Sequence, residues 1–145
     1  MEATIRITRI ETMRLALIGL VCALLMLLLM TGFEVFNFLM NLLPNILLGI
    51  IGLFFGSWFI AGLAGRLLFK RMLSPYLLGF LITILSLEFA TFCGSLVGYF
   101  QEGINSHNGI ADYIFTPLIG ILFWGSIPIV ILSVILGVRL AYKMK

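Results

Sequence analysis

The chain has 145 residues, of which 62% are hydrophobic and 10% are charged. A soluble domain is roughly 45–50% apolar and about 25% charged, so this composition excludes an ordinary water-soluble fold. The net charge of +3 does not indicate nucleic-acid binding, because the cations are divided among three short segments beside apolar stretches. We expect one integral membrane domain over residues 1–145, with the lipid bilayer as its solvent.

Four apolar stretches are each long enough to cross a bilayer as a helix, which takes about 20 residues. We predict spans over residues 15–33, 45–65, 75–100 and 113–138. The expected fold class is therefore an all-α membrane protein, a four-transmembrane-helix antiparallel bundle with short connections.

Residues 1–14 form a lead before the first span. Ala3, Ile7 and Ile10 share one helical face, and Arg6 and Arg9 lie off it. This pattern fits a basic helix on the inner membrane surface, and it fits equally an unstructured lead whose charges set the topology.

The connection 34–44 stays apolar, which is unusual for a loop. Glu34, Asn37, Asn41 and Asn45 recur at helical spacing, so their side chains share one face. Either the first helix extends outward, or a short helix lies in the outer interface before Pro44.

Glycines in the second and third spans indicate close helix packing. Small residues let two backbones approach, which is how helices associate in lipid. The predicted packing residues are Gly49, Gly52, Gly56, Gly94 and Gly98.

The fourth predicted span follows the loop 101–112. Asp112 can cap this helix, and Pro128 lies in its interior. Because proline removes a backbone hydrogen bond and its ring displaces a carbonyl group, we expect a kink at Pro128.

The distribution of basic residues predicts the orientation. All nine precede the first span, lie between the second and third, or follow the fourth: Arg6, Arg9, Arg14, Arg66, Lys70, Arg71, Arg139, Lys143 and Lys145. Cytoplasmic loops carry an excess of lysine and arginine, so both termini are expected in the cytoplasm. The small size and short loops favour the inner (cytoplasmic) membrane of a bacterium as the location.

One carboxylate, Glu88, lies inside a predicted span. It is 13 residues after Pro75, about 20 Å along a helix, and no lysine, arginine or histidine lies in any span to pair with it. An ionisable group at this depth is costly. We expect Glu88 to be protonated, to bind a cation, or to pair with a base from another subunit.

A polar track leads outward from Glu88. Its members share one helical face about 80° wide: Glu88, Thr91, Ser95, Tyr99 and Glu102. The track fits two functional classes, and it fits equally a carboxyl group that only holds neighbouring helices in register. The first class is an accessory or assembly subunit whose partner is a membrane protein or a second copy of this chain; the second is a small proton- or cation-coupled transporter or channel that uses Glu88 in an oligomer.

Enzymatic motifs are weak in this chain. Glu102, His107 and Asp112 lie on the outer loop, but one histidine and two carboxylates at this spacing make a poor metal site. No serine or cysteine has an evident base beside it. We therefore expect no catalytic residues, no metal and no cofactor. A membrane enzyme stays a third alternative, and it would need outer residues such as Glu34, Glu102, His107 and Asp112 to converge.

Overall fold

A computed structural model describes residues 1–31, 40, 42–70, 73–101 and 111–143 of the chain. Its helices are α1 (Glu2–Thr31), α3 (Leu43–Phe69), α4 (Pro75–Gln101), the π-helical turn η3 (Ala111–Phe115), α5 (Thr116–Trp124) and α6 (Ser126–Lys143). The predicted all-α fold is confirmed, and α3, α4 and α6 are long and apolar enough to cross a membrane. Most of the predicted segments 34–44 and 101–112 lies outside the described residues.

Proline and serine residues mark where helices begin. Pro44 and Pro117 lie in the first turns of α3 and α5, where the missing N–H of proline is not needed. Helix α4 begins at Pro75, and the backbone N–H of Leu77 donates to Oγ of Ser74 over 3.2 Å.

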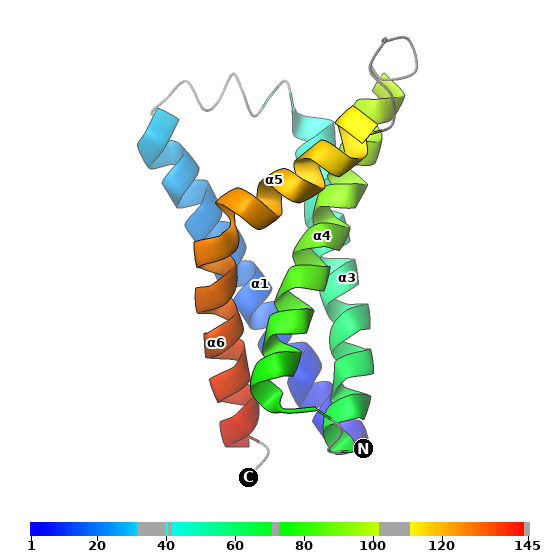
Figure 1. Cartoon of the computed structure of the whole chain (residues 1–145), viewed down its shortest axis with the longest axis vertical. Helices are drawn as coiled ribbons and strands as arrows, with labels where there is room; N and C mark the ends of the chain where they lie inside the picture. The colour runs from blue at the N-terminus through cyan, green and yellow to red at the C-terminus, as the bar shows by residue number, and fades with distance from the viewer. Residues whose placement is uncertain (32–39, 41, 71–72, 102–110, 144–145) are drawn as a thin grey trace.

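The helices converge at one end of the molecule and diverge toward the other. Helix α4 packs against both α3 and α6, while α1 crosses the bundle and contacts α3 and α6 (Figure 1). Both termini lie at the convergent end, and α5 runs obliquely from the region of α4 to the start of α6 (Figure 1). The helices are therefore close together at the end that carries the termini and farther apart at the opposite end.

The buried apolar core is small and lies toward the convergent end. It comes from the first halves of α1 and α4 and the second halves of α3 and α6: Leu15, Ala64, Leu68, Leu78, Ile82, Leu136 and Leu140. Large apolar side chains such as Leu25, Phe55 and Ile119 are instead more than half exposed. A compact core under an apolar outer surface is the arrangement expected of helices that pack in lipid.

The glycines predicted for helix packing all lie where α3 and α4 meet: Gly49, Gly52, Gly56, Gly94 and Gly98. A Cβ atom added at Gly52 would lie 2.8 Å from Cβ of Cys93, and one at Gly94 would lie 3.1 Å from the carbonyl oxygen of Asn45. Both distances are shorter than a comfortable carbon contact, so the two backbones approach as closely as they do because side chains are absent.

Helix α1 differs from the expectation for residues 1–14. These residues form neither a separate surface helix nor an unstructured lead, because α1 runs without a break from Glu2 to Thr31. The face turned into the bundle is polar, with Thr8, Glu11 and Thr12 buried, whereas Ile10 is exposed. The apolar face that predicted a surface helix is therefore not the face that packs.

Two glycines let this part of α1 lie on α3. A Cβ atom at Gly65 would lie 2.8 Å from Cα of Ile5, and one at Gly62 would lie 2.7 Å from Nη2 of Arg9. The Arg9 guanidinium also makes a cation–π contact with the indole of Trp58, and its Cζ lies 4.4 Å from the ring centroid.

The predicted fourth helix, 113–138, is divided in two. Helix α5 ends at Trp124 and α6 starts at Ser126, with Gly125 between them. Pro128 lies in the first turn of α6 and has no N–H to donate to the carbonyl group of Trp124, so the interruption falls within the turn before the proline. The structure thus contains a break at Gly125 where the sequence predicted a kink at Pro128.

Candidate functional site

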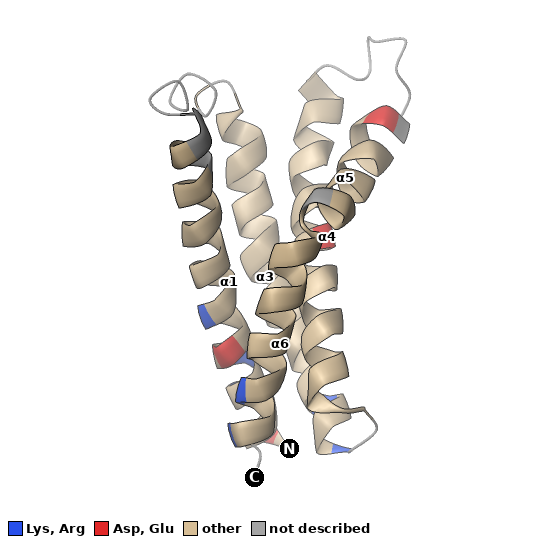
Figure 2. Ribbon diagram, turned by 60° about the vertical axis from the view of Figure 1, so that its left-hand side comes forward, with Lys and Arg blue, Asp and Glu red and all other residues tan. Residues whose placement is uncertain are grey.

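Glu88 lies midway along α4. Its side chain is half-buried, and its Oε1 atom is shielded from solvent without a hydrogen-bond partner among the described residues. The described lysine and arginine residues lie toward the convergent end, on the first half of α1, the last turns of α3 and the last turns of α6 (Figure 2). The part of the chain that the structure describes therefore offers Glu88 no basic partner.

The other members of the polar track follow Glu88 along α4. The Thr91 hydroxyl donates to the backbone oxygen of Leu87 over 2.9 Å, and Ser95 is half-buried. Tyr99 packs edge-on against Tyr113 of η3, with ring centroids 6.3 Å apart. Glu102 lies outside the described residues. The end of the track at Tyr99 thus meets η3, while Glu88 lies midway along α4 on the same helical face.

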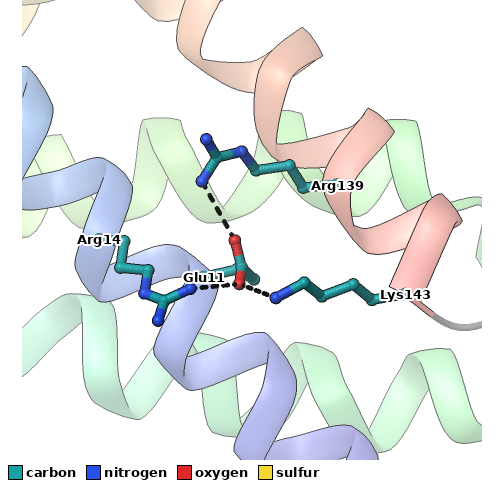
Figure 3. A network of polar contacts seen from close by, with 4 residues as sticks. All are labelled: Glu11, Arg14, Arg139 and Lys143. Atoms are coloured by element: carbon teal, nitrogen blue, oxygen red, sulfur yellow. Dashed lines mark hydrogen bonds and ion pairs between the residues drawn. The ribbon is translucent and has the colours of Figure 1, made fainter.

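A second carboxylate, Glu11 of α1, forms the densest charge cluster among the described residues (Figure 3). Its Oε1 atom lies 3.2 Å from Nη1 of Arg14 and accepts a hydrogen bond from Nζ of Lys143. Its Oε2 atom lies 3.3 Å from Nη1 of Arg139. The Glu11 side chain is 1% exposed, so one buried anion joins α1 to the last turns of α6.

The charge balance at Glu11 favours its ionised form. Burial raises the pKa of the carboxyl group, but the hydrogen bond and charge of Lys143, together with Arg139 and Arg14, outweigh burial and lower the pKa below its ordinary value of 4.5. Sequence analysis missed this cluster. A signal was present, because Thr8, Glu11, Thr12 and Leu15 share one helical face that leads into the first apolar stretch.

A cavity of about 310 Å³ lies between α1, α3, α4, α5 and α6. Most of its lining residues are leucine, isoleucine and alanine, and four lining residues carry hydroxyl groups: Thr12, Ser57, Thr83 and Ser86. Pro128 also lines it, whereas Glu88 does not. Sequence analysis missed the two serines, because an isolated serine in an apolar helix does not reveal where its hydroxyl group points.

Most of the polar residues that the sequence places in segments 34–45 and 101–112, for a shared helical face or for metal binding, are not part of the described structure. Glu34, Asn37, Asn41, Glu102 and His107 lie outside the described residues. Asp112 is exposed in η3, and Asn45 in α3 has a buried Oδ1 atom without a described hydrogen-bond partner.

The chain matches no protein-family model, no curated protein and no solved structure.

Proposed function

We propose that this chain is a four-span protein of the inner membrane, with both termini in the cytoplasm. The three long apolar helices support this topology, and so does α1, whose residues 15–31 carry no charge. Exposed side chains such as Leu17, Val21 and Leu29 give α1 an outward apolar face suited to lipid. The basic residues gather at the end that carries both termini (Figure 2), which the positive-inside rule places in the cytoplasm.

Within that membrane, the chain acts as an accessory or assembly subunit of a larger complex. The observation that carries this proposal is Glu88, a carboxylate midway along α4 whose Oε1 atom has no hydrogen-bond partner among the described residues. An ionisable group inside a membrane is retained where protein supplies its partner. The side chain is half-buried, so part of it reaches the surface of the bundle, where a partner helix can approach it.

The partner required by this geometry is a transmembrane helix with a lysine, an arginine or a hydrogen-bonding side chain at mid-membrane depth. A second copy of this chain could supply Thr91 or Ser95 from its own α4, and a different subunit could supply a base. The arrangement supports such a contact over ion conduction, because the cavity within the bundle is not lined by Glu88.

The Glu88 contact predicts the behaviour of a matched pair of variants. In mild detergent, the wild-type chain is expected to purify with a stoichiometric partner or as a homo-oligomer. Glu88→Ala should reduce the recovered partner at least tenfold, because it leaves the partner's polar group unpaired in lipid. Glu88→Gln should retain the partner if a hydrogen bond suffices and lose it if the partner is a base. Asp112→Asn removes an exposed carboxylate and should change nothing.

Recovery of a monomeric wild-type chain, or an unchanged complex with Glu88→Ala, would contradict the assembly role. A flux measurement separates the transport alternative. Proteoliposomes containing the purified chain are expected to match empty liposomes under proton and cation gradients, whereas a flux abolished by Glu88→Gln would favour transport.

A further inference from the structure

Two contrasting sets of serine and threonine residues occur in the described helices. In the first set, each hydroxyl donates to the carbonyl group four residues earlier in its own helix: Thr8, Thr83, Thr91 and Ser133. This is the usual way for serine and threonine to satisfy themselves in an apolar helix. The second set consists of Thr12, Ser57 and Ser86, whose oxygen atoms are buried without a hydrogen-bond partner among the described residues.

All three members of the second set line the same cavity. Their side chains are at most 4% exposed, and each belongs to a different helix, α1, α3 or α4. A buried hydroxyl without a partner costs free energy unless another molecule supplies the hydrogen bond. Their gathering around one space therefore indicates that something with polar groups occupies it.

Ser57 and Ser86 lie at the same depth. The antiparallel register of α3 and α4 brings Gly52 against Ala90 and Gly56 against Phe89, so Ser57 is level with Ser86 on the facing helix. Both serines lie near the middle of their helices. Two serines of the cavity lining, each with an unpartnered hydroxyl oxygen, thus lie at the depth where lipid offers fewest polar partners.

We propose that this cavity binds an uncharged, lipid-soluble molecule that carries carbonyl groups on an apolar body. Among the described residues that line the cavity, none is charged, so a charged ligand would lack compensation. The volume of about 310 Å³ lies at the lower end of the range for small-ligand sites. Carbonyl groups accept the hydrogen bonds that Ser57 and Ser86 have to donate.

Two membrane components share this chemistry, the carbonyl-bearing ring of an isoprenoid quinone and the ester groups of a neutral glyceride. Native mass spectrometry of the purified, delipidated chain can separate them. The probes are a short-chain benzoquinone and a short-chain diacylglycerol, each added over a range of concentrations. We expect saturable binding of one of them at one molecule per chain, and the one that binds identifies the source.

Variants of the cavity test the site itself. Ser57→Ala and Ser86→Ala should each weaken binding about fivefold, because each removes one neutral hydrogen bond. Ala16→Leu should weaken it at least tenfold, because it fills part of the cavity that Ala16 lines. Ser133→Ala is the matched control and should bind normally, because the Ser133 hydroxyl is already bonded to the oxygen of Ile129 and Ser133 does not line the cavity.

The absence of saturable binding for both probes would overturn the proposal, and so would equal affinities of the wild type and the Ser57→Ala/Ser86→Ala double variant. The serine substitutions keep the test valid even if Ala16→Leu fails to fold. None of these variants touches Glu88, so the outcome is independent of the assembly role.

Discussion

Glu11 is the residue with the most ionic partners among those described. Its three cations are 43–61% exposed, whereas the carboxylate is 1% exposed, so the anion is the buried member of the cluster. Arg139 and Lys143 belong to α6, whereas Glu11 and Arg14 belong to α1. The cluster therefore joins the first helix to the last through ion pairs between residues far apart in the sequence.

Replacing Glu11 by glutamine should lower the free energy of unfolding by roughly 2 kcal/mol, because charge-assisted hydrogen bonds are lost between α1 and α6. Unfolding of the purified protein in detergent measures this change. The matched control is Glu2→Gln, which removes an exposed carboxylate in the first turn of α1 and should lower stability by only about 0.5 kcal/mol, the effect of one charge at a helix N-terminus.

The same residue predicts a dependence of stability on pH. Because the folded state lowers the pKa of Glu11 below 4.5, the stabilisation is fully present above pH 4.5 and is lost as the pH falls toward the lower folded value. The free energy of unfolding should therefore fall less steeply between pH 7 and pH 3 in Glu11→Gln than in the wild type. Parallel curves for the two proteins would show that Glu11 does not carry this effect.

The two carboxylates show what a sequence reveals about single residues. Glu88 is conspicuous in the sequence because it is surrounded by apolar residues. Glu11 is surrounded by arginines and threonines, a pattern that predicts only a lead before the first span. Its main partners lie more than 120 positions away. Periodicity identifies a face of α1, but it cannot identify which helix covers that face.

At the scale of the helices, glycine contacts set the spacing between neighbours. The α3–α4 contact involves glycines that the sequence singled out. At the α4–α6 contact, a Cβ atom at Gly79 would lie 2.8 Å from the backbone nitrogen of Gly137, and one at Gly137 would lie 2.8 Å from Cα of Tyr76. Gly79 was missed because a lone glycine in a span has no partner within its own sequence neighbourhood.

Gly137→Ala should destabilise the bundle by roughly 1–3 kcal/mol, because the added methyl group meets the backbone of α4 rather than a flexible side chain. Gly120→Ala is the matched control in α5, where nothing lies within 4 Å of the added atom. That control should leave stability unchanged or raise it slightly, because alanine favours a helix over glycine. Equal effects of the two substitutions in detergent unfolding would contradict close packing at Gly137.

The division of the predicted fourth helix into α5 and α6 also depends on contacts between helices. Hydropathy extends without interruption across 113–138, so it predicts one span. Pro128 predicts a kink in this helix, but the direction of α5 depends on the helices against which it packs. Helix α5 contacts both α4 and α6, and neither contact can be predicted from local composition.

At the scale of the whole molecule, the basic residues and the most tightly packed part of the bundle lie at the same end. The basic residues, both termini and the buried apolar core all lie toward the convergent end (Figures 1 and 2). The cavity lies between the helices, and α5 forms part of its wall. The bundle is therefore tightly packed at the proposed cytoplasmic surface, and the Glu88 face of α4 is available to a partner.

Side-specific labelling of single cysteines tests the membrane topology on which this account rests. Cys22 and Cys93, both free thiols, are replaced by serine, and Lys70→Cys, Tyr142→Cys or Asp112→Cys is introduced at an exposed position. In sealed vesicles of known orientation, a membrane-impermeant thiol reagent should label Lys70→Cys and Tyr142→Cys from the cytoplasmic side and Asp112→Cys from the opposite side. Labelling of Lys70→Cys and Asp112→Cys from the same side would contradict the account.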